Sequence, residues 1–171
     1  MVEELLVSAL AAVLAELARP TQVDDGSGIG PFKSVCTVSE PASSHEVEAL
    51  RAGRDPIPAE LVEFWQLAGG ARLFEDPDYG QWGLVLLSAA SSRERTDAEF
   101  EMRPDDLAVG DIVIGEFLGD QELLLYSAGE GVLVALPLDS RGDWYRAGPT
   151  LTEFLERYTS SRGRKFWEGG C

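Results

Sequence analysis

The stretch "IPAELVEFWQLAGGARLF" (residues 57–74) contains a short helix, a pair of glycines and the start of a strand. Proline suits the first turn of a helix, because its missing N–H would have no partner there. Pro58 therefore predicts the helix start. Gly69 predicts the helix end, as the residue that most easily takes the left-handed conformation that closes a helix. Apolar spacing predicts a buried face of Leu61, Phe64, Trp65 and Ala68 and an exposed pair, Glu60 and Glu63.

After the glycine pair, the pattern changes from helical spacing to short apolar or alternating runs. Runs of this kind, bounded by Gly, Asp or Pro, are typical of β-strands. The stretches "GDQ" (119–121) and "AGEG" (128–131) lie between later runs and predict tight hairpin turns, so neighbouring strands should be antiparallel. The predicted strands are "ARLF" (71–74), "WGLVLLS" (82–88), "DIVIGEF" (111–117), "ELLLYS" (122–127) and "VLVALP" (132–137).

Helical patterns flank these strands. The first twenty residues carry an apolar stripe that ends at Pro20, and Glu3 and Glu4 stand where a signal peptide needs positive charge. We therefore expect an amphipathic helix over 1–20, with no export signal and no transmembrane segment. Its stripe is Leu6, Leu10, Val13, Leu14 and Leu17.

Three further segments complete the pattern. "SSHE" (43–46) matches a capping box and predicts a helix to about Arg51. The polar stretch 91–106 predicts a short helix plus loop, and 21–34 a loop. "TLTEFLERY" (150–158) predicts a helix capped by Thr150, whose inward residues are Leu151, Phe154, Leu155 and Tyr158.

Together these elements predict one α+β domain over residues 1–171. It has N-terminal helices, a central antiparallel sheet of about five to six strands and a C-terminal helix packed on the sheet. The core of the domain is expected over about 43–158, with 1–20 as an extra N-terminal helix and 159–171 as a tail.

The charge of the chain is strongly acidic, with 30 acids against 14 bases and a net charge of −16. Such a protein repels nucleic acid and anionic membranes and attracts basic partners. Residues 75–130 hold 14 acids and three bases, which concentrates the acidity on the sheet and its loops. A solvated face and a docking surface for a basic protein both explain this concentration.

The residue types that carry catalysis or bind metals are sparse. His45 is the one histidine, and Cys36 and Cys171 form no metal motif, so we expect no catalytic residues, metal or cofactor in a cytoplasmic protein that is not an enzyme. A hydrolase that uses two carboxylates remains an alternative, because among 30 acids some pair will lie at any spacing. The stretch "DPDYG" (76–80) lacks a calcium-loop pattern, and we expect Asp76 and Asp78 to be solvated.

The four tryptophans allow two interpretations. Trp65 lies in the helical stripe and is expected in the core. Trp82 and Trp144 lie beside turns, where aromatic residues often belong to protein interfaces. Taken alone, a core position is the preferred interpretation for each of them and for Trp167.

With these elements placed, the chain resembles the SUKH superfamily, named partly after a fungal regulator of cell-wall synthesis. The first similar motif is a proline, a helix with a central aromatic residue, a glycine turn and a strand. The second is an apolar strand, a glycine, a short spacer, another glycine and a second strand. The third is a final helix of the "sFxeFL" kind. The residues of the first motif are Pro58, Phe64, Gly69, Gly70 and Phe74. Those of the second are Ile114, Gly115, Gly119 and 123–125, and the third corresponds to "TLTEFLERY" (150–158) with Phe154.

The resemblance covers about Ser43 to Tyr158. The chain departs from the family pattern at Ala68, where asparagine is common, and at Tyr126-Ser127, where an acidic or polar residue is usual. The N-terminal helix and the 91–106 insertion lie outside the pattern.

The resemblance implies a bacterial immunity protein, which binds and neutralises a cognate toxin without turnover. Many toxins of this kind are nucleases, and a nuclease surface must be basic to hold phosphates. An alternative from the same resemblance is an intracellular scaffold or regulatory module for protein interactions. The oligomeric state stays open. We predict a toxin-binding surface among Glu75, Asp76, Asp78, Trp82, Glu116, Asp120 and Trp144.

Overall fold

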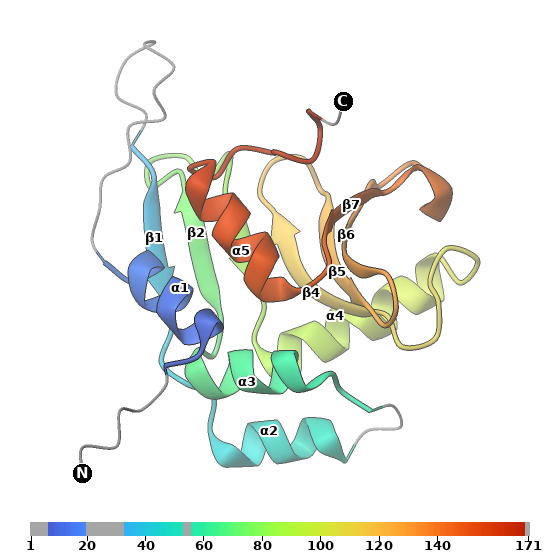
Figure 1. Cartoon of the computed structure of the whole chain (residues 1–171). Coiled ribbons are helices and arrows are strands. Elements are labelled where there is room, and N and C mark those ends of the chain that lie inside the picture. The colour runs from blue at the N-terminus through green and yellow to red at the C-terminus, as the bar shows by residue number, and fades with distance from the viewer. Residues whose placement is uncertain (1–6, 20–32, 53–55, 170–171) are drawn as a thin grey trace.

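The computed structural model describes residues 7–19, 33–52 and 56–169, which form an α+β fold (Figure 1). Within these residues, seven strands make one antiparallel sheet whose spatial order is the order of the chain. The predicted fold class is confirmed, with a strand count slightly above the expected one. The strands are β1 (Val35–Val38), β2 (Ala71–Glu75), β3 (Leu84–Leu86), β4 (Ile112–Phe117), β5 (Leu123–Ser127), β6 (Gly131–Ala135) and β7 (Tyr145–Gly148).

All five predicted strands are present, and the sequence analysis missed β1 and β7. These two are the outermost strands of the sheet and only four residues long, and neither has the apolar run that marks the inner strands. The expected hairpin turns at 119–121 and 128–131 both connect antiparallel neighbours.

Five α-helices accompany this sheet within the described ranges, and one of them, α2, packs on α3 and α4. The capping box at Ser43 is confirmed, because Glu46 N–H donates to Ser43 Oγ (3.3 Å) and Ser43 N–H donates to Glu46 Oε2 (2.8 Å). The helix expected after Pro58 is confirmed with its buried face, and so is the one capped by Thr150. The helices are α1 (Ala9–Leu17), α2 (Ser44–Arg51), α3 (Ala59–Leu67), α4 (Ala89–Met102) and α5 (Leu151–Ser160).

Two expectations about helical segments are corrected. The segment 91–106 holds the expected helix and loop, but the helix, α4, is longer than expected, since it begins at Ala89 and has 14 residues. The expected tail continues the fold, since Trp167 is buried in an aromatic cluster with Phe154 and Tyr158. The first six residues and most of the loop expected over 21–34 lie outside the described residues.

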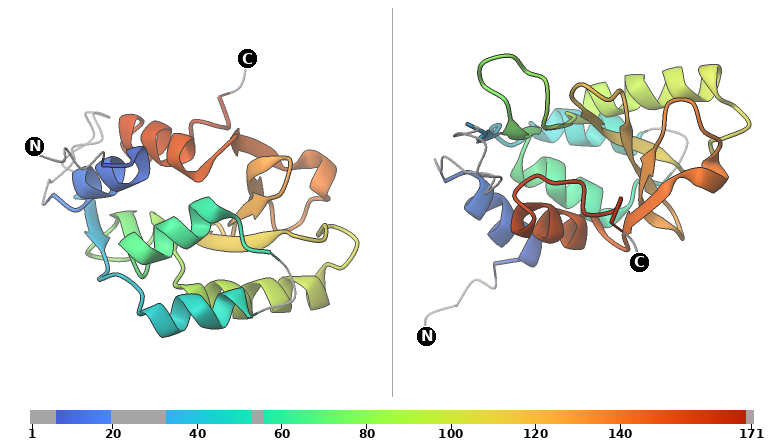
Figure 2. Two further views of the ribbon diagram at one scale, coloured as in Figure 1. Left: turned by 60° about the horizontal axis from the view of Figure 1, so that its bottom comes forward. Right: turned by 90° about the horizontal axis from the view of Figure 1, so that it is seen from above.

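The sheet separates two clusters of buried side chains. Helices α1, α3 and α5 cover one face and bury the larger cluster, which includes Trp65, Leu73, Leu124 and Phe154. The opposite face carries a smaller cluster that includes Val113, Leu125 and Trp144. Figure 2 shows α4 on the side of the sheet opposite to α1 and α5. None of the described helices is long and apolar enough to cross a membrane.

The glycine pair of the opening stretch joins three segments of chain. The N–H of Gly69 donates to Glu40 O (2.7 Å), and a Cβ on Gly69 would lie 2.6 Å from the same oxygen. Gly70 has a φ of +144°, and its Cβ would lie 2.9 Å from Leu86 O. The expectation of a left-handed Gly69 is therefore wrong: Gly70 takes the positive φ, and Gly69 is required by close approach.

Substitution of Gly70 by alanine should lower the free energy of unfolding by about 1–3 kcal/mol, because the new Cβ is strained at this φ and crowds Leu86. Urea denaturation measures the change. Gly142→Ala is the matched control, since a Cβ there would meet nothing within 4 Å. Equal stability of the two variants would show that the junction tolerates a side chain.

Glu60 has a structural role that its expected position on the exposed face did not indicate. Its carboxylate accepts hydrogen bonds from the N–H groups of Leu151 (2.9 Å) and Thr152 (2.8 Å), the first residues of α5. A negative charge there satisfies free N–H groups and interacts favourably with the helix dipole. Glu60 thus fixes the start of α5 against α3.

Glu60→Gln should lower the free energy of unfolding by about 1–2 kcal/mol, because a neutral amide offers one acceptor oxygen where the carboxylate offers two. Glu63→Gln, one turn away on the same helix, should change it by less than about 0.5 kcal/mol. Thermal or urea unfolding compares the pair, and a loss confined to Glu63→Gln would contradict this role of Glu60.

Candidate functional site

Two hairpin tips lie against each other at one end of the sheet. The β2–β3 loop (76–83) and the β4–β5 turn (118–121) form this region, which we call the hairpin edge. The N–H of Leu118 donates to Gly83 O (2.9 Å), and a Cβ on Gly119 would collide with Gln81 O. Only a residue without a side chain fits there, so the two tips are held as one rigid surface.

Asp76 holds the β2–β3 loop in shape. It is only 4% exposed, and its carboxylate accepts the N–H groups of Asp78 (3.0 Å) and Gln81 (3.4 Å). Its own N–H donates to Trp82 O (3.1 Å). The expectation that Asp76 is solvated is wrong, because its oxygens are used inside the loop, and it is therefore removed from the predicted contact surface.

The ordered loop presents aromatic and acidic side chains to solvent. Tyr79 is 81% exposed, Trp82 is 36% exposed, and Asp78 lies exposed beside them. Tyrosine and tryptophan are enriched at protein interfaces and carry much of their binding energy. The sequence analysis did not single out Tyr79; its place before Gly80 in the "DPDYG" turn was the available signal, since turn tips project side chains outward.

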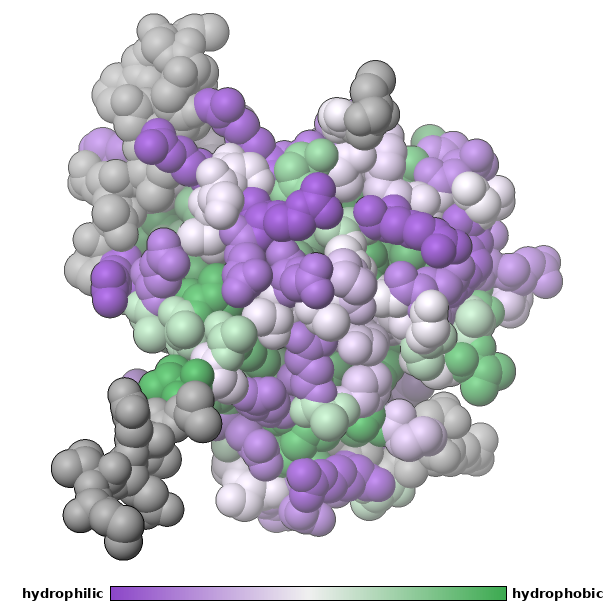
Figure 3. Space-filling view, in the orientation of Figure 1, coloured by the Kyte–Doolittle hydropathy of each residue, from purple (hydrophilic) through white to green (hydrophobic). Residues whose placement is uncertain are grey.

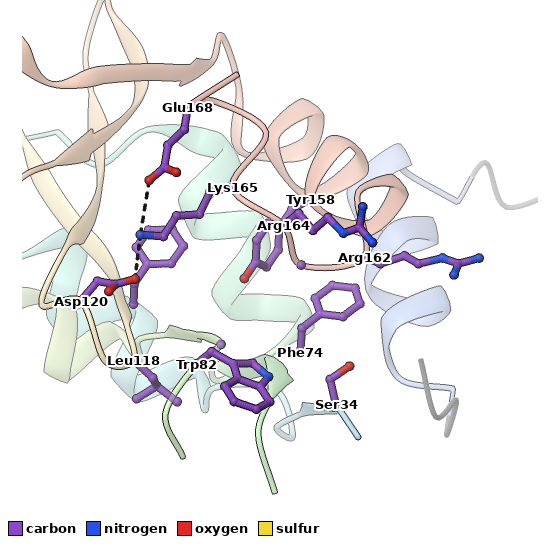
Figure 4. A pocket seen from close by; sticks show the side chains of 13 residues that line it. Ser34, Phe74, Trp82, Leu118, Asp120, Tyr158, Arg162, Arg164, Lys165 and Glu168 are labelled. Atoms are coloured by element: carbon purple, nitrogen blue, oxygen red, sulfur yellow. Dashed lines mark ion pairs between the residues drawn. The ribbon is translucent and has the colours of Figure 1, made fainter. Parts of the chain in front are cut away.

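The remaining predicted acids at this end are paired within the chain. Glu75 lies at the base of the loop and pairs with Arg72 (2.5 Å). Asp120 pairs with Lys165 (2.7 Å), which also holds Glu122 (2.8 Å) and Glu168 (3.6 Å), as Figure 4 shows in part. Burial lowers the pKa of Lys165, but the carboxylates of Asp120 and Glu122 outweigh it and raise this pKa above its usual value.

A cleft of about 470 Å³ separates the hairpin edge from the segment after α5. Its aromatic walls include Phe74, Trp82 and Tyr158, and burial raises the pKa of the Tyr158 hydroxyl. Arg162 and Arg164 lie on the far lip, across from Trp82 (Figure 4). The cleft therefore has a basic lip beside an acidic edge.

Glu116 lies on the other face of the sheet. A β-bulge between Val113 and Gly115 changes the alternation of β4 and turns the Glu116 side chain toward α4. There its Oε1 accepts from Arg95 Nε (2.8 Å). The β4–β5 turn thus separates Glu116 from Asp78 and Trp82.

Trp144 is not part of an exposed site. It is 7% exposed, its Nε1 donates to Asp139 O (3.1 Å), and the guanidinium groups of Arg103 and Arg141 lie over its ring at 5.2 and 5.6 Å. The core interpretation of Trp144 is confirmed, and its ring is not part of the exposed surface at the hairpin edge.

Among residues 7–19, 33–52 and 56–169, no three His, Cys, Asp or Glu side chains are grouped so that they could hold a metal ion. Of the predicted contact residues, Glu75, Asp78, Trp82 and Asp120 remain together on or beside the hairpin edge. In comparisons with known proteins, the sequence matches no family model and no curated protein.

Asp76→Ala should lower the free energy of unfolding by about 1–3 kcal/mol, because two partly buried N–H groups lose their acceptor. Asp78→Ala, two residues on and exposed, should stay within about 0.5 kcal/mol of the parent. Chemical denaturation measures the free energy of unfolding of both variants, and Trp82 fluorescence, in a background without the other tryptophans, serves as a probe of the loop. Equal effects of the two substitutions would contradict the assigned role of Asp76.

Proposed function

We propose that this chain is an immunity protein of the SUKH type, which binds a basic bacterial toxin through the hairpin edge and blocks it without turnover. The observation that carries the proposal is the composition of this edge. The hairpin edge, residues 76–83 and 118–121, holds three acids and no base, and it presents two exposed aromatic residues, Tyr79 and Trp82.

The positions of the family-like motifs support the resemblance. Gly69 and Gly70 lie where three segments meet, and Gly119 lies where the two hairpin tips touch. Gly115 lies in the bulge of β4, where a Cβ would be 3.0 Å from Val85 O. Each glycine has a structural reason, as expected for residues that define a fold rather than a binding specificity.

Electrostatics gives the proposed binding a physical mechanism. A toxin that acts on nucleic acid needs a basic surface to hold phosphates. An acidic edge on the inhibitor speeds the encounter with such a surface, and rigid aromatic anchors then slow dissociation. Occupation of the basic surface excludes the substrate, so inhibition needs no catalytic group.

A growth assay in a heterologous host tests the proposal. The C-terminal domain of the protein encoded next to this chain is expressed with and without the chain. Killing by the neighbour and rescue by this chain support immunity. A harmless neighbour, or killing despite this chain, overturns it and leaves the scaffold or regulatory module as the better interpretation.

Asp78→Lys should slow association with the toxin domain identified by the growth assay by about 3–10-fold at low salt. It should also make the association rate depend less on salt, because it reverses a charge on the surface that the toxin domain meets first. Glu156→Lys makes the same change on the exposed side of α5 and should leave the rate within about twofold. Stopped-flow or surface-based kinetics at several salt concentrations gives both rates. Identical behaviour of the two variants would show that the acidic edge only improves solubility.

A further inference from the structure

The hairpin edge alone is small for a tight inhibitor. It comprises residues 76–83 and 118–121, twelve in all, whereas stable interfaces use about 20–30 residues on each side. A partner that binds tightly must therefore contact a neighbouring surface as well. The face that carries α1, α3 and α5 shows hydrophobic residues only in small separate areas among polar ones (Figure 3).

Two hollows flank the β4–β5 turn and are the nearest extensions of the edge. The cleft on one side has Arg162 and Arg164 on its lip, and these cations oppose the approach of a basic surface. The other hollow lies between α4, the β4–β5 turn and the end of β6, and we call it the α4 groove. It has a volume of about 590 Å³.

One exposed apolar side chain lines the α4 groove, and a second follows its lining residue Pro137 in the chain. Met102 lines it and is 61% exposed, and Leu138, which follows the groove residue Pro137, is 95% exposed. The backbone on both sides of Leu138 is anchored: Arg103 donates to Leu136 O (2.9 Å) and to Asp139 O. Leu138 is thus held outward, and methionine adapts readily to an incoming surface.

The groove also has an excess of negative charge. The guanidinium group of Arg95 is shared by Glu99 (2.7 Å) and Glu116 (2.8 Å), so two carboxylates face one cation. The Glu99 side chain is 5% exposed, whereas that of Glu116 is 41% exposed and accessible to a further cation. The lining also holds Glu122 and Arg103, so that three carboxylates stand against two guanidinium groups.

From the proposed function and these observations, we infer that the basic partner extends from the hairpin edge across the β4–β5 turn into the α4 groove. There, apolar side chains of the partner pack on Met102 in the groove and on Leu138 beside it, and an adjacent lysine or arginine pairs with Glu116. The resulting surface has aromatic anchors on one side of the turn and aliphatic anchors on the other, with carboxylates around both.

The test measures binding of the toxin domain identified by the growth assay to the full chain and its variants. Met102→Ala/Leu138→Ala should weaken binding at least about tenfold, mainly through faster dissociation. Val109→Ala is the control, because Val109 is 87% exposed on the segment between α4 and β4, outside the groove. It should stay within about twofold. Urea unfolding of each variant checks that the fold is intact, since all three side chains are exposed.

Two further variants separate the possible failures. Arg164→Ala, on the basic lip of the cleft, should bind as tightly as the parent or more tightly, and a tenfold loss there overturns the inferred direction. If Tyr79→Ala weakens binding while the double variant does not, the groove inference is wrong and the proposed function stands. If the unaltered chain does not bind the toxin domain, both are overturned.

Discussion

The close approach at Gly69–Gly70 is the constraint on which the rest of the structure depends. The end of α3, the residues after β1 and the end of β3 meet there, and hydrogen bonds link Gly69 to Glu40 and Gly70 to Ser39. Side chains at these positions would push the three segments apart. Because the junction fixes α3 against the sheet, it also fixes Glu60, which holds the first N–H groups of α5. The glycine junction therefore positions α3 directly, and α5 through Glu60.

The same physical principle orders the candidate site. At the hairpin edge, as at the helix junction, a glycine allows backbone to touch backbone, here Gly119 against Gln81. Asp76 adds hydrogen bonds inside the loop, and these order the backbone that carries Tyr79. A rigid anchor loses little conformational entropy on binding, which favours tight association. Stability and proposed binding thus use the same contacts.

Local patterns explain what the sequence predicted well. The stripe of α3, the inner strands and the caps at Ser43 and Thr150 follow from spacing over a few residues. Helix α4 was underestimated because it buries polar groups: Ser92 donates to Val113 O, and Glu99 pairs with Arg95. No apolar stripe marks such a helix.

The site was predicted in part for a related reason. Charge and turn composition located the acidic end of the sheet, but not which carboxylates are exposed. Asp76 is buried through bonds to amides, and Glu116 changes face through a bulge, and neither follows from residue type.

The spatial order of the strands bears on how quickly the protein folds. Four of the six connections between neighbouring strands are shorter than ten residues, and local contacts of this kind favour fast folding. The packing of α1 on α5, in contrast, joins the two ends of the chain. Each of these short hairpins can therefore form before the terminal helices meet, whereas the contact between the two tips must span the longer β3–β4 connection.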